Sequence, residues 1–157
     1  MVMMDGCLGI LLVEDERQLS RAISRRLRGY GFDVVAAPTI AMARVLECRF
    51  RVGIFDIDLG DGSGIDLARE FLACDRVGRA IFFTATADEA ALRCAGEVGP
   101  VVSKREGVEA LLPVLGAALP EHLPRESGIV PRFDVDTIVG PESLPDPKTL
   151  VQGRRAG

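Results

Sequence analysis

Two carboxylates in the middle of the chain, Asp56 and Asp58, have the types and spacing that could do chemistry. They follow the apolar residues 52–55 and precede the glycine-rich segment 60–64. An apolar run closed by Asp and Gly predicts a buried strand that ends at Asp56. Ligands bind at the ends of strands in open α/β sheets, but Asp and Gly are also ordinary turn residues. By itself, the segment leaves an active site and a solvated turn equally open.

Polar side chains follow other apolar segments in the same way. Including Asp56, they occur after four predicted strands: Glu14 and Asp15, then Asp56, then Thr84, then Lys104. The ends of parallel strands share one edge of a sheet, so these groups can converge there. Strand ends are commonly polar, which explains any one position. This tendency explains the whole set poorly, because the residue types complement one another. The set combines carboxylates that could bind a hard cation, a carboxylate that could act as a nucleophile, a hydroxyl donor and an ammonium group.

The elements that must position these residues are five strands alternating with helices. The strands are predicted at residues 8–13, 32–37, 52–56, 79–84 and 99–103. Short connections and strict alternation predict an α/β fold with a parallel sheet and right-handed crossovers. The continuous apolar residues 80–83 are typical of a strand covered on both faces.

The helices are predicted from apolar periodicity and capping residues. A first helix ends near Gly29, and Thr39 begins a second that reaches about Cys48, with Ala41, Val45 and Leu46 facing inward. Two further helices occupy residues 63–73 and 88–97. In the last helix, 108–119, Pro113 predicts either a kink or a late start of the helix.

The composition changes after residue 119. Six of the nine prolines lie in residues 120–157, which have no helical period. The predicted domain is therefore 1–119, and 120–157 is predicted to be an extended or disordered Pro-rich extension.

Charge and cysteine usage exclude several classes of protein. The 157 residues carry a net charge of −4, which argues against binding nucleic acid by phosphate neutralisation. The four cysteines form no zinc spacing with the single His122, and reduced thiols are expected. No apolar run approaches the length of a membrane span. We expect a cytoplasmic protein without a membrane segment.

Four motifs together resemble the receiver domain of two-component response regulators. They are Leu-Leu-Val-Glu-Asp at 11–15, the segment 55–67 around Asp56, Phe-Thr-Ala at 83–85 and Val-Val-Ser-Lys at 101–104. Each motif alone is weak, but all occur in the expected order over about residues 8–119. The resemblance implies a flavodoxin-like, doubly wound (βα)5 fold whose five-stranded parallel sheet has the strand order 2-1-3-4-5.

The resemblance also implies a phosphorylation site. Asp56 would be the phosphoacceptor, taking a phosphoryl group from the phosphohistidine of a histidine kinase or of a phosphotransfer protein. Mg²⁺ would offset the negative charge that meets at this site. Its ligands would be the carboxylates of Asp15 and Asp56 and the backbone carbonyl of Asp58, with Glu14 acting directly or through a water.

Two further residues would contact the phosphoryl group. Thr84 would donate its hydroxyl to one phosphoryl oxygen, and Lys104 would pair with another. The resemblance thus describes a signalling protein that catalyses its own phosphorylation and dephosphorylation. Residues 120–157 have near-balanced charge and no helix-turn-helix pattern, and they are too few for a DNA-binding domain. We therefore expect the output to be contact with a downstream protein target without direct DNA binding, and a homodimer is left open.

Three alternatives remain at this point. Asp56 and Asp58 also resemble the first motif of haloacid-dehalogenase-like phosphohydrolases, as nucleophile and general acid. That family does not explain Glu14 and Asp15, and Gly60 departs from its pattern. A second alternative is a pseudo-receiver, a binding module that no longer accepts phosphate. The third is that the chain is a fragment of a longer regulator.

Overall fold

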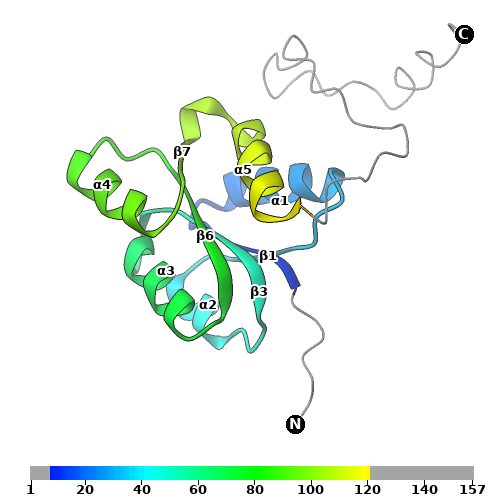
Figure 1. The fold of residues 1–157 in the computed structure, drawn as a ribbon, viewed down its shortest axis with the longest axis horizontal. Coiled ribbons are helices and arrows are strands. Elements are labelled where there is room, and N and C mark those ends of the chain that lie inside the picture. The colour runs from blue at the N-terminus through cyan, green and yellow to red at the C-terminus, as the bar shows by residue number, and fades with distance from the viewer. Residues whose placement is uncertain (1–7, 121–157) are drawn as a thin grey trace, which may run out of the picture. The chain divides into compact units, whose positions relative to one another are not determined.

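The fold is built around a parallel sheet with helices on both faces, in a computed structural model that describes residues 8–120. Figure 1 shows α1 and α5 on one face of the sheet, and α2, α3 and α4 on the other. Residues 121–157 lie outside the described residues, so the predicted Pro-rich extension is not described beyond Pro120.

The main sheet has five parallel strands in the order β2-β1-β3-β6-β7. These strands are β1 (Leu8–Val13), β2 (Val34–Ala37), β3 (Phe50–Phe55), β6 (Val77–Thr84) and β7 (Val101–Ser103). Numbered within this sheet alone, the order is 2-1-3-4-5, which confirms the predicted fold class. The sequence did not predict β4 (Asp58–Leu59) and β5 (Gly62–Ser63), which form a separate antiparallel hairpin after Asp56.

Within residues 8–120, four helices connect the strands of the main sheet and a fifth, α5, follows the last strand. They are α1 (Arg17–Gly29), α2 (Ile40–Val45), α3 (Gly64–Ala73), α4 (Glu89–Val98) and α5 (Leu111–Ala118). Two 3₁₀ turns, Lys104–Glu106 and Val108–Ala110, precede α5. The late helix start is confirmed, because Pro113 lies in the first turn of α5, where its missing N–H removes no helical hydrogen bond. Across residues 8–120, no helix has the length and apolar character needed to cross a membrane.

The predicted caps begin three of these helices. The Ser63 hydroxyl accepts hydrogen bonds from the first turn of α3, and the Asp88 carboxylate does the same for α4. The Thr39 hydroxyl accepts one from the backbone N–H of Met42 in α2. These local bonds satisfy N–H groups that a helix leaves unpaired at its start.

The predicted inward face of the second helix is wrong at two of its three residues. Ala41 and Val45 are exposed, whereas Ile40 and Ala43 are buried. Leu46 is half-buried against the core, as predicted. The helix is also shorter than predicted and ends at Val45. In so short a helix the apolar period is ambiguous, and contact with the β4–β5 hairpin decides which side faces the core.

Two apolar layers cover the faces of the sheet. One, against α2, α3 and α4, contains Phe55, Phe71 and Phe82, and the other, against α1 and α5, contains Ile54 and Leu115. The ring of Phe55 packs edge-on against Phe71, with centroids 6.4 Å apart, and at 6.2 Å from the Phe82 centroid. The aromatic group that precedes Asp56 in the chain therefore fixes the end of β3 in the core.

We expect Phe55→Ala to lower the free energy of unfolding by about 3–5 kcal/mol, because it removes a fully buried ring and leaves a cavity. Phe55→Leu should cost less, since it refills part of the space. The measurement is equilibrium urea denaturation followed by circular dichroism. The control is Val45→Ala, because the Val45 side chain is 69% exposed. This substitution should change the free energy of unfolding by no more than about 0.5 kcal/mol. Equal effects of Phe55→Ala and Val45→Ala would contradict this packing.

Candidate phosphoacceptor and metal site

Strand register brings the predicted site residues to one edge of the sheet. Val13 pairs with Phe55 across β1 and β3, so the next residues, Glu14 and Asp56, leave adjacent strands side by side. Thr84 pairs with Ser103 across β6 and β7, so Lys104 leaves the sheet at the same edge.

The Lys104 ammonium joins two of these strand ends. Its Nζ lies 2.7 Å from Oδ2 of Asp56 and 2.8 Å from Oε2 of Glu14. Both carboxylates are almost completely buried, and the lysine side chain is 16% exposed. Buried charges are tolerated when they are paired and hydrogen-bonded. Lys104 therefore stabilises two carboxylates that would otherwise repel each other.

Burial and pairing act in opposite directions on these charges. Burial raises the pKa of Glu14, although Lys104 and the backbone N–H of Glu16 donate hydrogen bonds to it. Burial also lowers the pKa of Lys104, but its hydrogen bonds with Asp56 and Glu14 outweigh that effect, and the pKa of the ammonium is raised. Lys104 is consequently charged throughout the neutral range.

Three carboxylates lie close enough together to share one cation. Oxygen atoms of Glu14, Asp15 and Asp56 all lie within 4.8 Å of one another. Glu14 and Asp56 are buried, whereas Asp15 is exposed at the mouth of the cluster. Lys104 neutralises only part of their negative charge. All donors are oxygens, as a hard divalent cation such as Mg²⁺ requires, so the residues present fit a Mg²⁺ site.

Thr84 and Asp58 flank this cluster in different ways. Thr84 ends β6 and is buried, and its Oγ1 accepts a hydrogen bond from the backbone N–H of Thr86 at 3.2 Å. Asp58 begins β4 with its side chain exposed, and its carboxylate is not part of the three-carboxylate cluster. The predicted ligand from Asp58 was its backbone carbonyl, which needs no inward side chain.

Glycine is required where α3 begins behind Asp56. A Cβ atom on Gly64 would lie 1.7 Å from the backbone oxygen of Asp56, which no real structure tolerates. The Gly64 N–H also donates a 2.9 Å hydrogen bond to the Ile57 carbonyl. The close approach of these two backbones brings the chain back beside Asp56 immediately after the hairpin.

Sequence reasoning missed Asp61, in the turn of the β4–β5 hairpin. Its Oδ1 accepts a hydrogen bond from the Ile40 N–H at 3.0 Å, and its Oδ2 accepts one from the Ala41 N–H at 3.2 Å. These hydrogen bonds lower the pKa of Asp61, and the bond from Ile40 has a larger effect than the bond from Ala41. These partners are about 20 positions away, so no local capping pattern could have revealed them.

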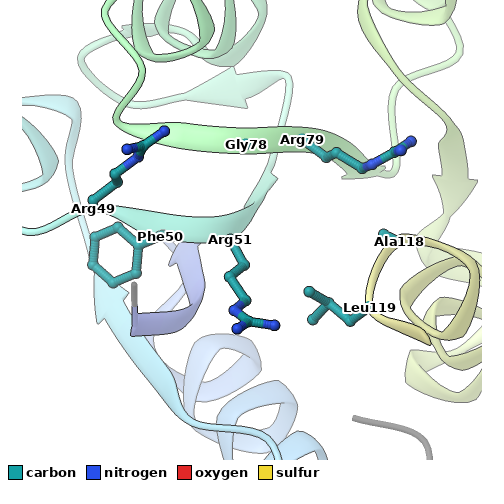
Figure 2. Close-up of a pocket in the computed structure, with 7 residues that line it drawn as sticks. All are labelled: Arg49, Phe50, Arg51, Gly78, Arg79, Ala118 and Leu119. Carbon is teal, nitrogen blue, oxygen red and sulfur yellow. The ribbon is translucent and has the colours of Figure 1, made fainter. Parts of the chain in front are cut away.

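A pocket at the opposite end of β3 is separate from this site. It has a volume of about 290 Å³ and is lined by residues that include Arg49, Arg51 and Arg79. Figure 2 shows their guanidinium groups pointing in different directions rather than toward a common centre. The arginines therefore do not form a convergent anion site comparable to the carboxylate cluster.

The response regulator receiver domain family matches residues 10–114. The chain belongs to this family. The receiver domain thus carries the α/β fold, the acidic cluster and the lysine described above. Receiver domains bind Mg²⁺ at an acidic pocket and interact with histidine kinases or phosphotransfer proteins, and they are generally signalling proteins rather than classical enzymes.

Individual relatives agree with this assignment. The transcriptional regulatory protein DpiA of Escherichia coli K12 is 34% identical over 99 residues, which are 58% of this chain and 44% of DpiA. The chain therefore spans less than half of the length of this curated relative. The non-phosphorylated HemR receiver domain from Leptospira biflexa is 28% identical with a TM-score of 0.64, and the match covers 71% of this chain and 94% of that receiver domain.

A more distant structure supports the fold. The CheY-like receiver domain protein from Methanospirillum hungatei JF-1 superposes with a TM-score of 0.66 at 22% identity, and it covers 74% of this chain and 97% of that protein.

The contacts of Asp61 predict a pH-dependent contribution to stability. Its pKa is lowered by folding, so its contribution is complete above the unfolded pKa of about 3.9 and is lost as the pH falls through the folded value. We expect Asp61→Ala to lower Tm at pH 7 and the difference from wild type to narrow below about pH 4. Thermal unfolding at a series of pH values measures both.

The matched control for this prediction is Asp33→Ala, which removes an exposed carboxylate. Its Tm difference from wild type at pH 7 should be small, because the side chain is exposed. If the Tm difference between Asp61→Ala and wild type stayed constant down to pH 3, the ionised carboxylate of Asp61 would contribute nothing to stability.

Proposed function

We propose that this receiver domain is phosphorylated on Asp56 and acts as a response regulator. The observation that supports this most directly is the position of Asp56, whose Oδ2 accepts from Lys104 Nζ at 2.7 Å beside the carboxylates of Glu14 and Asp15. The donor would be a phosphohistidine on a histidine kinase or a phosphotransfer protein. The reaction belongs in the cytoplasm, where ATP supplies such kinases.

The Mg²⁺ site would be formed by the carboxylates of Asp15 and Asp56 and the backbone carbonyl of Asp58. Glu14 would contribute directly or through a water, since Lys104 already occupies its Oε2. When bound, Mg²⁺ would offset the repulsion between the carboxylate and the phosphoryl oxygens. This ligand set is supported by the spacing of the carboxylate oxygens of Glu14, Asp15 and Asp56 and by the burial of Glu14 and Asp56.

The chemistry of the chain's own residues follows from their positions. A carboxylate oxygen of Asp56 attacks phosphorus as the phosphorus–nitrogen bond of phosphohistidine breaks, and the imidazole leaves with the electron pair. Lys104 remains close to the phosphoryl oxygens, and the Thr84 hydroxyl donates to one of them. Attack of water on phosphorus later releases phosphate and restores the Asp56 carboxylate. The domain thereby catalyses its own phosphorylation and dephosphorylation.

The output that we propose is contact with a downstream protein, either a separate target or a second copy of the chain. The net charge of −4 supports protein contact rather than direct DNA binding. DpiA is a transcriptional regulatory protein, so DNA binding by a larger assembly is a second output that the relatives keep open.

Acetyl phosphate provides the direct test. We expect Mg²⁺-dependent addition of one phosphoryl group, measured by intact-protein mass spectrometry, and its loss in Asp56→Asn or in excess EDTA. Asp33→Asn, which removes an exposed carboxylate, should be labelled like wild type. Absence of labelling in the wild type would refute the proposal and favour a pseudo-receiver. Sustained turnover of a phosphomonoester would instead indicate a phosphohydrolase.

The ion pairs of Lys104 predict opposite effects on binding and chemistry. Lys104→Ala removes a cation that competes with Mg²⁺ for the carboxylates, so Mg²⁺ should bind about ten-fold more tightly. The rate of labelling by acetyl phosphate should nevertheless fall by about 10²–10³-fold, because the phosphoryl oxygens lose a charged donor. Isothermal titration and the labelling time course measure the two quantities separately.

The control for this prediction is Arg105→Ala, which removes the adjacent exposed cation. It should leave the labelling rate within about two-fold of wild type, as expected of an exposed charge away from the acceptor. Equal losses of rate in the two variants would show that general positive charge, and not the Lys104 contact, assists the reaction.

A further inference from the structure

The β4–β5 hairpin is tied to α2 by one side chain. Asp61 lies in its two-residue turn and accepts hydrogen bonds from the N–H groups of Ile40 and Ala41, the first two residues of α2. The Thr39 hydroxyl accepts a hydrogen bond from the backbone N–H of Met42 at 3.0 Å. The Thr39 carbonyl accepts one from the backbone N–H of Ala43, also at 3.0 Å. The four N–H groups that begin α2 are thus satisfied, two of them by Asp61.

Packing brings the same two segments together. Leu59 of the hairpin and Ile40 of α2 are buried in one apolar cluster. A Cβ atom on Gly62 would lie 2.9 Å from Cδ1 of Ile40, so the hairpin backbone is pressed closely against α2. A hairpin with only two residues in each strand is marginal by itself. Its position therefore depends on this contact with α2.

The other side of the hairpin faces the carboxylates. A Cβ atom on Gly60 would lie 3.5 Å from Oδ2 of Asp15, which places the turn beside the exposed member of the cluster. Asp58, whose carbonyl is proposed as a Mg²⁺ ligand, is the first residue of the same hairpin. Any movement of the hairpin relative to α2 would shift this carbonyl relative to Asp15 and Asp56.

We infer that Asp61 is a positioning residue for the metal site, because it anchors to α2 the hairpin that carries the Asp58 carbonyl. The inference rests on the proposed function, since it extends the proposed Mg²⁺ ligand set. Asp61 itself touches neither the phosphoryl group nor the cation. It limits the freedom of a backbone ligand, in the way that residues around a metal site hold its direct ligands in place.

The test compares two variants that weaken the same end of α2. Asp61→Ala removes the anchor from the hairpin, whereas Thr39→Ala removes the local cap and leaves the Asp61 contacts. Mg²⁺ alone is titrated into each ¹⁵N-labelled protein, and the Kd is read from amide chemical shifts. We expect Asp61→Ala to raise the Kd about ten-fold and Thr39→Ala to leave it within about two-fold of wild type, even where both lower Tm.

A third variant separates anchoring from charge. Asp61→Asn removes the negative charge but keeps an oxygen acceptor for one N–H group of α2. If anchoring is what matters, the Kd of Asp61→Asn for Mg²⁺ should lie between those of wild type and Asp61→Ala. The difference in Kd between Asp61→Ala and wild type should also persist at about 1 M salt, where exposed charges are screened. The inference would be overturned in favour of a charge effect if Asp61→Asn and Asp61→Ala had equal Kd values and if the difference in Kd between Asp61→Ala and wild type disappeared at high salt.

The remaining outcomes distinguish this inference from the function on which it rests. Mg²⁺ binding by the wild type with an unchanged Kd in Asp61→Ala would overturn the inference alone. Equal rises of the Kd in Asp61→Ala and Thr39→Ala would also overturn it, because loss of α2 stability would then be sufficient. Absence of Mg²⁺ binding by the wild type would overturn both the inference and the proposed metal site.

Discussion

The ammonium group of Lys104, shared between Asp56 and Glu14, is the interaction on which the site depends. Each partner leaves a different strand, so the two ion pairs connect β1, β3 and β7 at one edge of the sheet. Burying Glu14 and Asp56 next to each other without a cation would be strongly unfavourable. Lys104 makes their burial tolerable, and the exposed carboxylate of Asp15 lies beside them at the mouth of the cluster.

This arrangement requires parallel strands in the observed order. β1 and β3 are adjacent in the centre of the sheet, so Glu14 and Asp56 leave it side by side. The core then holds those ends rigidly, since Phe55 is fully buried against rings from α3 and β6. The hairpin after Asp56 has too few residues to be rigid by itself, and it depends on α2 and on Asp61.

The error at α2 shows where sequence patterns lose information. Ala41, Val45 and Leu46 formed one plausible apolar face, but a helix of six residues is too short for its period to define a single face. Burial of Ile40 and Ala43 follows from contacts that the segment makes with the rest of the core. At Pro113, by contrast, a local steric rule limited the prediction to a kink or a late helix start, because proline is compatible with the first turn of a helix but not with its interior. The structure shows the late start, with α5 beginning at Leu111.

The sequence by itself determined the α/β class and the residues that end each strand. These features follow from local apolar runs and from glycine and proline positions, all of which are visible in neighbouring residues. The strand order was implied by the family resemblance, which rests on the order of four motifs. Only the tertiary structure decided that Lys104 pairs with both Glu14 and Asp56, that Gly64 must lack a side chain and that Asp61 caps a helix about 20 positions earlier. The physical reason is that these contacts depend on strand register and on the path of a hairpin, which bring together atoms from segments that no local pattern relates.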